Sequence, residues 1–158
     1  MKSTGEAIGY DDRLTRALYK ALQASGMKLA NYGTVYVTVA RQDREEALPL
    51  VRRFYQMGFN IFATPGTGRF LKDHGIRTHV VGKLSEGNSE ILDAIRAGYV
   101  SYIINTQDLS DSSGLSDGRT MRQVATENNV NMFTSLDTVR VLLDVLEETT
   151  LTISTIDA

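Results

Sequence analysis

Two threonines and a glycine lie in a short segment where this chain could hold an anion. Residues 60–63 form an apolar run typical of a buried strand, and residues 68–75 have the pattern of a short helix that ends at a glycine. Thr64, Gly66 and Thr67 lie between them. The first N–H groups of a helix lack internal partners and carry partial positive charge, so this turn suits a phosphate or carboxylate oxygen. A simpler interpretation, in which a threonine only caps the helix, stays open.

Polar residues follow two further strands that the sequence predicts. Lys83 comes shortly after residues 77–81, and Asn105 and Thr106 come after residues 99–104. The carboxyl ends of parallel strands meet at one edge of a sheet, so these side chains are expected beside the threonine turn. Hydroxyls, an amide, backbone donors and one cation together fit a phosphorylated small molecule. A lysine after a strand is by itself usually solvated, and the shared topological position is what favours a site.

The remaining segments supply the elements that position these residues. Residues 34–40 are β-branched and aromatic, which indicates a strand, and residues 130–133 predict a last core strand. Helices are expected at residues 13–22, 43–57, 89–97 and 117–128, and in a closing segment after Thr134. This alternation of strands and helices predicts an α/β fold, with a parallel sheet covered on both faces and right-handed crossovers.

Several local features refine these expectations. Asp43 and Ser89 are predicted N-caps, and Pro49 should kink its helix or move the regular part downstream. Residues 107–116 are rich in serine, aspartate and glycine and predict a mobile loop. The alternating tail at residues 151–156 predicts an edge strand.

Composition excludes several function classes. The 158 residues fit one domain with a real core, and 17 basic against 19 acidic residues give a net charge of −2, without a basic surplus for nucleic acid. Cysteine is absent, and His74 and His79 lack metal-ligand spacing, so we expect no metal site. No apolar run approaches the roughly 20 residues of a membrane span. The first residues carry no apolar signal core, and we therefore expect a cytoplasmic protein.

Five segments carry a family resemblance: residues 37–44, 63–67, 81–87, 102–106 and 117–119. Through them, residues 34–147 resemble the methylglyoxal-synthase-like superfamily, and within it the C-terminal allosteric domain of the carbamoyl-phosphate synthetase large subunit. The resemblance implies a three-layer fold with a parallel five-stranded sheet. It also implies that residues 1–30 are a connector and first helix from a preceding synthetase domain, and that residues 31–158 form the effector-binding domain.

The resemblance assigns roles to single positions. In these synthetases the pocket holds a nucleoside monophosphate effector such as UMP or IMP. Positions matching Thr64, Thr67 and Lys83 hold the phosphate, and those matching Asn105 and Thr106 contribute from the next strand.

Three further positions follow from the same resemblance. Arg44 stands where some relatives carry a lysine. The positive charge is kept, but a planar guanidinium with several N–H donors replaces a compact ammonium group. Thr120 and Met121 match positions near the base or ribose.

The resemblance also implies a longer enzyme, an ATP-dependent ligase that makes carbamoyl phosphate for pyrimidine and arginine biosynthesis. ATP, Mg and K would be bound by its other domains, and a glutaminase small subunit would be a partner. This domain would regulate without catalysing and would hold no cofactor. Consistent with that division, the sequence contains neither a Walker-type phosphate loop nor a G-x-G-x-x-G motif.

Two alternatives stay open. Methylglyoxal synthases share this fold and remove phosphate from dihydroxyacetone phosphate, a reaction that needs a carboxylate base. Where that family places catalytic aspartates, this chain has Asn88 and Thr106, although Glu86 and Asp108 are close enough in sequence to leave a displaced base open. The other alternative is an interaction domain that binds no small ligand.

Overall fold

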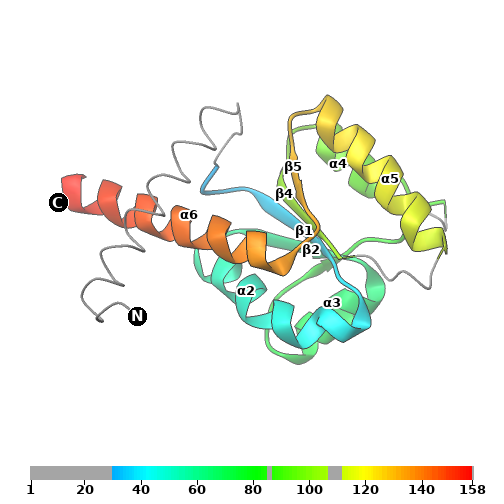
Figure 1. Ribbon diagram of the computed structural model, residues 1–158, viewed down its shortest axis with the longest axis horizontal. Coiled ribbons are helices and arrows are strands. Elements are labelled where there is room, and N and C mark those ends of the chain that lie inside the picture. Colours follow the sequence, from blue (N-terminus) through cyan, green and yellow to red (C-terminus); the bar gives the residue numbers. More distant parts are fainter. Residues whose placement is uncertain (1–29, 85–86, 107–111, 158) are drawn as a thin grey trace, which may run out of the picture.

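A parallel five-stranded sheet forms the centre of the computed structural model, which describes residues 30–84, 87–106 and 112–157 (Figure 1). The strands are β1 (Thr34–Thr38), β2 (Asn60–Ala63), β3 (His79–Val80), β4 (Val100–Asn105) and β5 (Asn131–Phe133). They pair in the order β3-β2-β1-β4-β5, and every pair is parallel. The predicted fold class is confirmed.

Helices cover both faces of this sheet. They are the 3-10 turn η1 (Arg41–Asp43) and the α-helices α2 (Arg44–Gln56), α3 (Pro65–Asp73), α4 (Glu90–Arg96), α5 (Ser112–Glu127) and α6 (Leu136–Asp157). Apolar residues of α2, α3 and α6 pack in one core cluster with Val35 and Val37 of β1, and those of α4 and α5 pack in a second cluster with Tyr36. Successive residues of a strand point to opposite faces, so β1 serves both layers.

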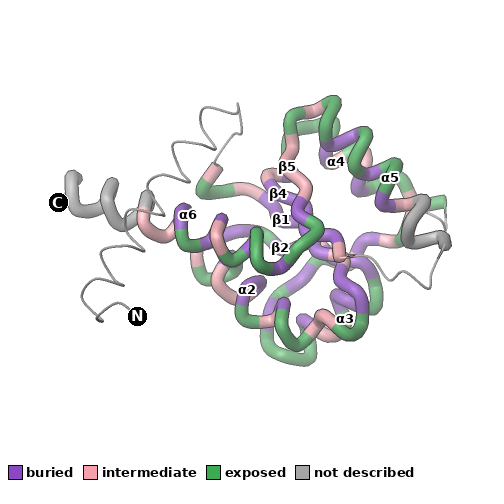
Figure 2. Tube along the Cα trace, in the orientation of Figure 1, coloured by how far each residue is buried: buried purple, intermediate pink, exposed green. Residues whose placement is uncertain are grey.

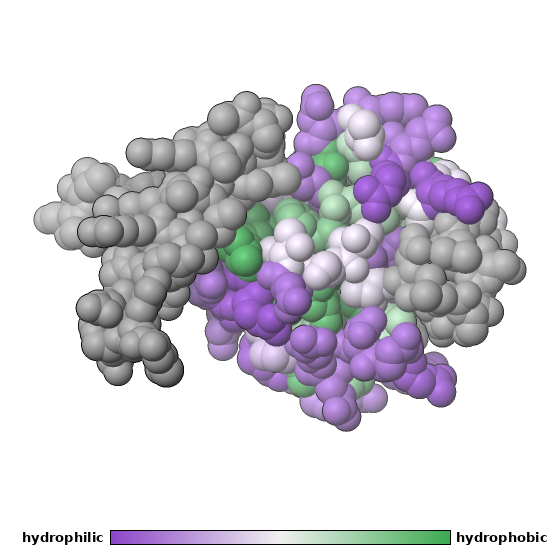
Figure 3. All heavy atoms as spheres, viewed as in Figure 1, coloured by the Kyte–Doolittle hydropathy of each residue, from purple (hydrophilic) through white to green (hydrophobic). Residues whose placement is uncertain are grey.

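The distribution of buried residues matches this layered arrangement of sheet and helices. The strands at the centre are buried, and exposed residues lie on the outer sides of the helices (Figure 2). In the space-filling view, hydrophilic residues lie above and below, and paler or apolar residues gather between them (Figure 3). Within the described residues, no helix combines the length and apolar character that a bilayer crossing requires.

The topology places a crevice at one end of the sheet. From β1 the chain passes through α2 to β2, and from β4 it passes through α5 to β5, in the opposite direction and over the opposite face. The strand order therefore reverses between β1 and β4. In open parallel sheets, the space beyond the carboxyl ends of two such strands is where ligands bind.

Helix α3 begins earlier than the sequence pattern indicated. Pro65 is its first residue and Thr64 its N-cap, although the Thr64 side chain makes no capping hydrogen bond. A proline has the fixed φ that suits the first helical position and lacks an N–H that would need a partner there. Thr67 therefore lies inside the first turn, and the Gly68 N–H already donates to the Thr64 carbonyl at 2.7 Å. Of the first N–H groups, those of Gly66 and Thr67 are left without an intrahelical acceptor.

The other predicted caps differ in detail. Asp43 and Ser89 stand at N-cap positions, but neither side chain makes a capping hydrogen bond. Helix α4 is instead capped by Asn88, whose Oδ1 accepts from the Glu90 N–H at 2.9 Å. Helix α2 continues through Pro49.

The C-terminal half differs more. Residues 151–156 belong to α6, so the predicted edge strand is wrong; the sequence holds no glycine or proline there to end the helix. Helix α5 starts at Ser112, which makes the second half of the predicted mobile loop helical, since serine and aspartate also suit a first helical turn. Residues 107–111, the predicted helix at 13–22 and nearly all of the predicted connector lie outside the described residues.

Candidate functional site

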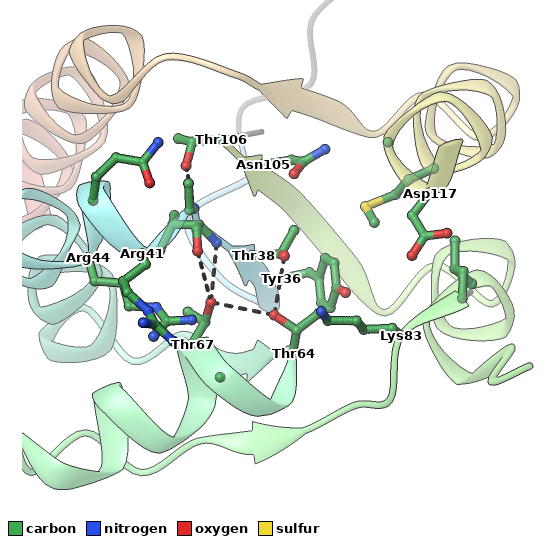
Figure 4. A pocket seen from close by; sticks show the side chains of 17 residues that line it. Tyr36, Thr38, Arg41, Arg44, Thr64, Thr67, Lys83, Asn105, Thr106 and Asp117 are labelled. Carbon is green, nitrogen blue, oxygen red and sulfur yellow. Dashed lines mark hydrogen bonds between the residues drawn. The ribbon is translucent and has the colours of Figure 1, made fainter. Parts of the chain in front are cut away.

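A pocket of about 420 Å³ opens beyond the carboxyl ends of β1 and β4 (Figure 4). It receives residues from the ends of these strands, from η1 and α2, from the first turn of α3, from the segment after β3, and from α5. The lining consists of Tyr36, Thr38, Val39, Ala40, Arg41, Gln42, Arg44, Thr64, Gly66, Thr67, Lys83, Leu84, Asn105, Thr106, Asp117, Gly118 and Met121.

Two threonine hydroxyls hold the segment that leaves β1. The Val39 N–H donates to Thr67 Oγ1 at 3.2 Å, and the Ala40 N–H donates to Thr106 Oγ1 at 2.9 Å. We call this pair of bonds the threonine clamp. It fixes two successive backbone groups from either side, one from α3 and one from the end of β4. Since Arg41 follows directly, the clamp also sets where the chain turns into η1 and α2.

The hydroxyl of Thr64 belongs to the same network. Thr64 Oγ1 lies 3.2 Å from Thr38 Oγ1 and 3.4 Å from Thr67 Oγ1. Thr64 and Thr67 are 7 % and 1 % exposed, so neither is a solvated surface residue. Each hydroxyl has a single proton, so an anionic ligand oxygen would compete with Thr38 and Thr67 for the proton of Thr64.

Three cations surround the first turn of α3. A Cβ built on Gly66 would lie 2.5 Å from Nη2 of Arg44, so the guanidinium rests against the helix start where only a glycine leaves it room. Figure 4 shows Arg41 and Arg44 beside Thr67, and Lys83 beyond Thr64. Among the described residues, no carboxylate forms an ion pair with any of these three cations.

Arg44 is the most constrained of the three. Its Nε is buried and has no hydrogen-bond partner among the described residues. Burial, and then repulsion from Arg41, lower the pKa of the Arg44 guanidinium, although an arginine keeps its charge near neutral pH. A buried charged donor without an acceptor is costly, and an anion placed here would relieve that cost.

The opposite end of the pocket has a different character. Asp117 lies there, across from Arg41 and Arg44, and Tyr36 lies nearer to Thr64 and Lys83 (Figure 4). Tyr36 is 1 % exposed, and burial together with the nearby Asp117 carboxylate raises the pKa of its phenol well above the usual value, so the phenol is a neutral hydrogen-bonding group. Asn105 is 6 % exposed. The two arginines therefore line one side of the pocket and the Asp117 carboxylate lines the opposite side (Figure 4).

The structure brings together eight of the nine residues named from the sequence. They are Arg44, Thr64, Gly66, Thr67, Lys83, Asn105, Thr106 and Met121. Thr120 is exposed on α5 and does not line the pocket.

Sequence reasoning missed further lining residues that carry polar groups: Tyr36, Thr38, Arg41, Gln42 and Asp117. Tyr36 and Thr38 are two residues apart in β1 and therefore point to the same face of the sheet, which the two-residue period of a strand could have predicted. Arg41 is three residues before Arg44, which places the two on neighbouring positions of a helical turn.

Other chemistry-bearing residues lie away from this pocket. His79 Nε2 contacts Glu90 Oε2 at 2.7 Å beside β3, and His74 Nδ1 contacts the Phe70 carbonyl at 2.8 Å. The described residues contain no group of three or more histidines, cysteines, aspartates or glutamates placed to hold a metal ion.

The sequence profile of MGS-like domains matches residues 46–134, more than half of the chain. The chain belongs to the MGS-like domain family. The match includes the α3 turn, Lys83, Asn105 and Asp117, whereas Arg41 and Arg44 precede it.

Solved structures share the fold of this MGS-like domain. The crystal structure of methylglyoxal synthase from Elizabethkingia anophelis NUHP1 superposes with a TM-score of 0.58 at 16 % identity, over 73 % of this chain and 79 % of that one. The crystal structure of ForH gives a TM-score of 0.55 at 18 % identity, over 74 % of this chain and 81 % of that one. At sequence identities this low, the similarity to both structures establishes a shared fold alone.

Proposed function

We propose that this MGS-like domain is the allosteric regulatory domain of a carbamoyl-phosphate synthetase large subunit, and that its pocket binds a nucleoside monophosphate of the UMP or IMP type. The observation that carries the proposal is the cationic end of the pocket. Arg41, Arg44 and Lys83 surround a helix start, and no carboxylate of the described residues pairs with them. That is the arrangement a phosphate dianion needs.

The dimensions agree with a small nucleotide. A pocket of about 420 Å³ falls in the range of roughly 300–1,000 Å³ that is usual for small-molecule sites. Leu84 and Met121 give the lining an apolar part that can pack against a base, while the threonines and Asn105 supply polar groups. The phosphate would bind between the α3 turn and the cations, with the sugar and base extending toward α5.

In this proposal residues 31–158 form the effector domain, and residues 1–30 join it to a preceding synthetase domain. ATP, Mg and K would be used elsewhere in the longer enzyme, with a glutaminase small subunit as partner. The enzyme would be cytoplasmic and would serve pyrimidine and arginine biosynthesis. Effector binding would change catalysis through a coupling free energy between this pocket and the distant active sites.

A lyase of the methylglyoxal synthase type is the alternative, and one observation favours it: Asp117 places a carboxylate in the pocket. Asn88 does not line the pocket, because its side chain caps α4. The Thr106 hydroxyl accepts from the Ala40 N–H and cannot abstract a proton from carbon. Glu86 and Asp108 lie outside the described residues.

Calorimetric titration tests the proposal. UMP and IMP should bind the 158-residue chain, uridine and inosine should bind far more weakly, and inorganic phosphate should compete. Lys83→Ala should weaken nucleotide binding by about 10–150-fold, the equivalent of one charge-assisted hydrogen bond of roughly 1.5–3 kcal/mol. Lys72→Ala, an exposed lysine at the far end of α3, is the matched control and should change nothing.

Each competing function gives a different result. Phosphate release from dihydroxyacetone phosphate well above background, abolished by Asp117→Asn, would establish the lyase instead. If no phosphorylated ligand binds, the remaining function is that of an interaction domain without a small ligand. Equal affinity of Lys83→Ala and the unmodified chain for UMP would remove Lys83 from the site.

A further inference from the structure

The segment that carries Lys83 to the pocket is anchored at both ends by buried residues. It follows β3, where the Val81 N–H donates to the Ala63 carbonyl at 2.8 Å, and it leads into α4. Val81 and Ile91 are buried in the same core cluster. Between these anchors Lys83 is exposed, and its side chain extends toward Thr64 (Figure 4). Since burial does not fix this side chain, the backbone around it decides where the ammonium lies.

Asn88 joins the two ends of this segment. Its Oδ1 accepts from the Glu90 N–H at 2.9 Å, and its own N–H donates to the Lys83 carbonyl at 3.4 Å. Its side chain also lies against Gly82, because a Cβ built on Gly82 would be 2.6 Å from Nδ2 of Asn88 and 3.1 Å from its Cβ and Cγ. Only a glycine therefore leaves room for Asn88 beside the residue that precedes Lys83.

A second contact between the two ends of the segment is exposed. His79 Nε2 lies 2.7 Å from Glu90 Oε2, and the two side chains are 53 % and 47 % exposed. Such a pair contributes little in water, because solvent screens it and both side chains lose freedom. Asn88 is half-buried, so its packing against Gly82 is the firmer of the two connections.

We propose that Asn88 is a positioning residue of the pocket, which holds the backbone of Lys83 where its ammonium reaches a bound anion. Neither Gly82 nor Asn88 lines the pocket, so both act on a ligand through the residues that they hold, of which Lys83 carries the charge. A binding group works best when its supporting contacts keep it within about 0.5 Å of the productive geometry. This inference rests on the proposed function, because it takes Lys83 to contact the phosphate of the ligand.

Calorimetric titration with UMP and with inorganic phosphate tests this role. Asn88→Ala should weaken both ligands about 3–10-fold, a part of the roughly 10–150-fold loss expected for Lys83→Ala, since the ammonium is displaced and not removed. Gly82→Ala should give a similar loss, because the added Cβ excludes the Asn88 side chain. Ser89→Ala is the matched control. It removes the neighbouring exposed hydroxyl, which donates to Asp93 of α4 at 3.4 Å, and should leave both affinities unchanged.

A double-mutant cycle separates positioning from a general loss of structure. In a Lys83→Ala chain, adding Asn88→Ala should cause no further loss of phosphate affinity, because the group that Asn88 positions is gone. Gly82→Ala and Asn88→Ala act through one contact, so the chain with both changes should bind phosphate no more weakly than Asn88→Ala alone. Circular dichroism and urea unfolding check that each variant folds.

The results distinguish the positioning role from the function beneath it. If Lys83→Ala weakens UMP and Asn88→Ala does not, the phosphate site stands and the positioning role is wrong. If Asn88→Ala weakens phosphate equally with and without Lys83, Asn88 acts independently of Lys83, and the positioning role is again wrong. If the unmodified chain binds neither UMP nor phosphate, the proposed function fails, and the inference fails with it.

Discussion

Replacing Thr67 by valine tests whether the threonine clamp holds the end of β1. Valine keeps the shape of the side chain and removes the hydroxyl that accepts from the Val39 N–H at 3.2 Å. Val39 is 6 % exposed, so its N–H has little access to water as a substitute. Leaving a buried donor unsatisfied costs about 1–3 kcal/mol. Burying an extra methyl group returns up to about 0.8 kcal/mol. The expected net loss is therefore about 1–2 kcal/mol.

Urea unfolding of the 158-residue chain measures this loss, with an unchanged m-value. In a thermal scan it corresponds to a decrease of about 2–8 °C in Tm for a chain of this size. Thr67→Ser keeps the hydroxyl and should recover most of the stability. Thr138→Val makes the same exchange at an exposed position of α6 and should be nearly neutral.

The same variants decide what the Thr67 hydroxyl does for a ligand. If it only positions the chain before Arg41 and Arg44, Thr67→Val should weaken UMP and inorganic phosphate by similar factors, together with the loss of stability. A Thr67→Val chain as stable as wild type would refute the clamp. If that stable variant also lost affinity for phosphate more than tenfold, the hydroxyl would contact the ligand rather than hold the strand.

Three further predictions follow from other contacts. Gly66→Ala should leave the fold as stable as wild type but weaken phosphate binding several-fold, because the added Cβ would displace the guanidinium of Arg44. Urea unfolding and phosphate titration of the variant check this, and an unchanged phosphate affinity would contradict it. Arg53 donates to two carboxylates of α6, so Arg53→Lys should lose about 1 kcal/mol in urea unfolding. Arg140 also pairs with two carboxylates, Glu46 and Asp137, but its side chain is more exposed, so Arg140→Lys should lose less, and equal losses would argue against this reasoning. Burial raises the pKa of Tyr102 above its usual value of 10.0, so the folded chain keeps a proton that the unfolded chain loses, and stability falls as pH rises above 10. Tyr102→Phe should make that fall less steep, by up to about 1.4 kcal/mol per pH unit, and an unchanged slope between about pH 9 and 11 would show that Tyr102 is not responsible.

The sequence by itself determined the sheet and one edge of the pocket. Short β-branched runs alternating with helical patterns require a parallel sheet, and parallel strands bring their carboxyl ends together. Thr64, Gly66 and Lys83 follow strands at that edge and Asn105 is the last residue of one, so local pattern and topology were enough to group them. The same reasoning failed for residues 151–156, because apolar alternation in a short segment does not exclude a helix that has no stop signal.

Only the tertiary structure decided how these groups act on one another. The two bonds of the threonine clamp join residues 28 and 66 positions apart, and no local signal reports such a contact. From the sequence, Thr67 therefore looked like a free phosphate ligand, whereas in the fold its hydroxyl accepts a hydrogen bond from Val39, directly after β1. Arg44 reaches Gly66 only because α2 and α3 pack on the same face of the sheet. Asp117 lies near Tyr36 only because α5 covers the opposite face of the sheet. In each of these cases, tertiary packing, and not spacing along the chain, sets which side chains share a pocket.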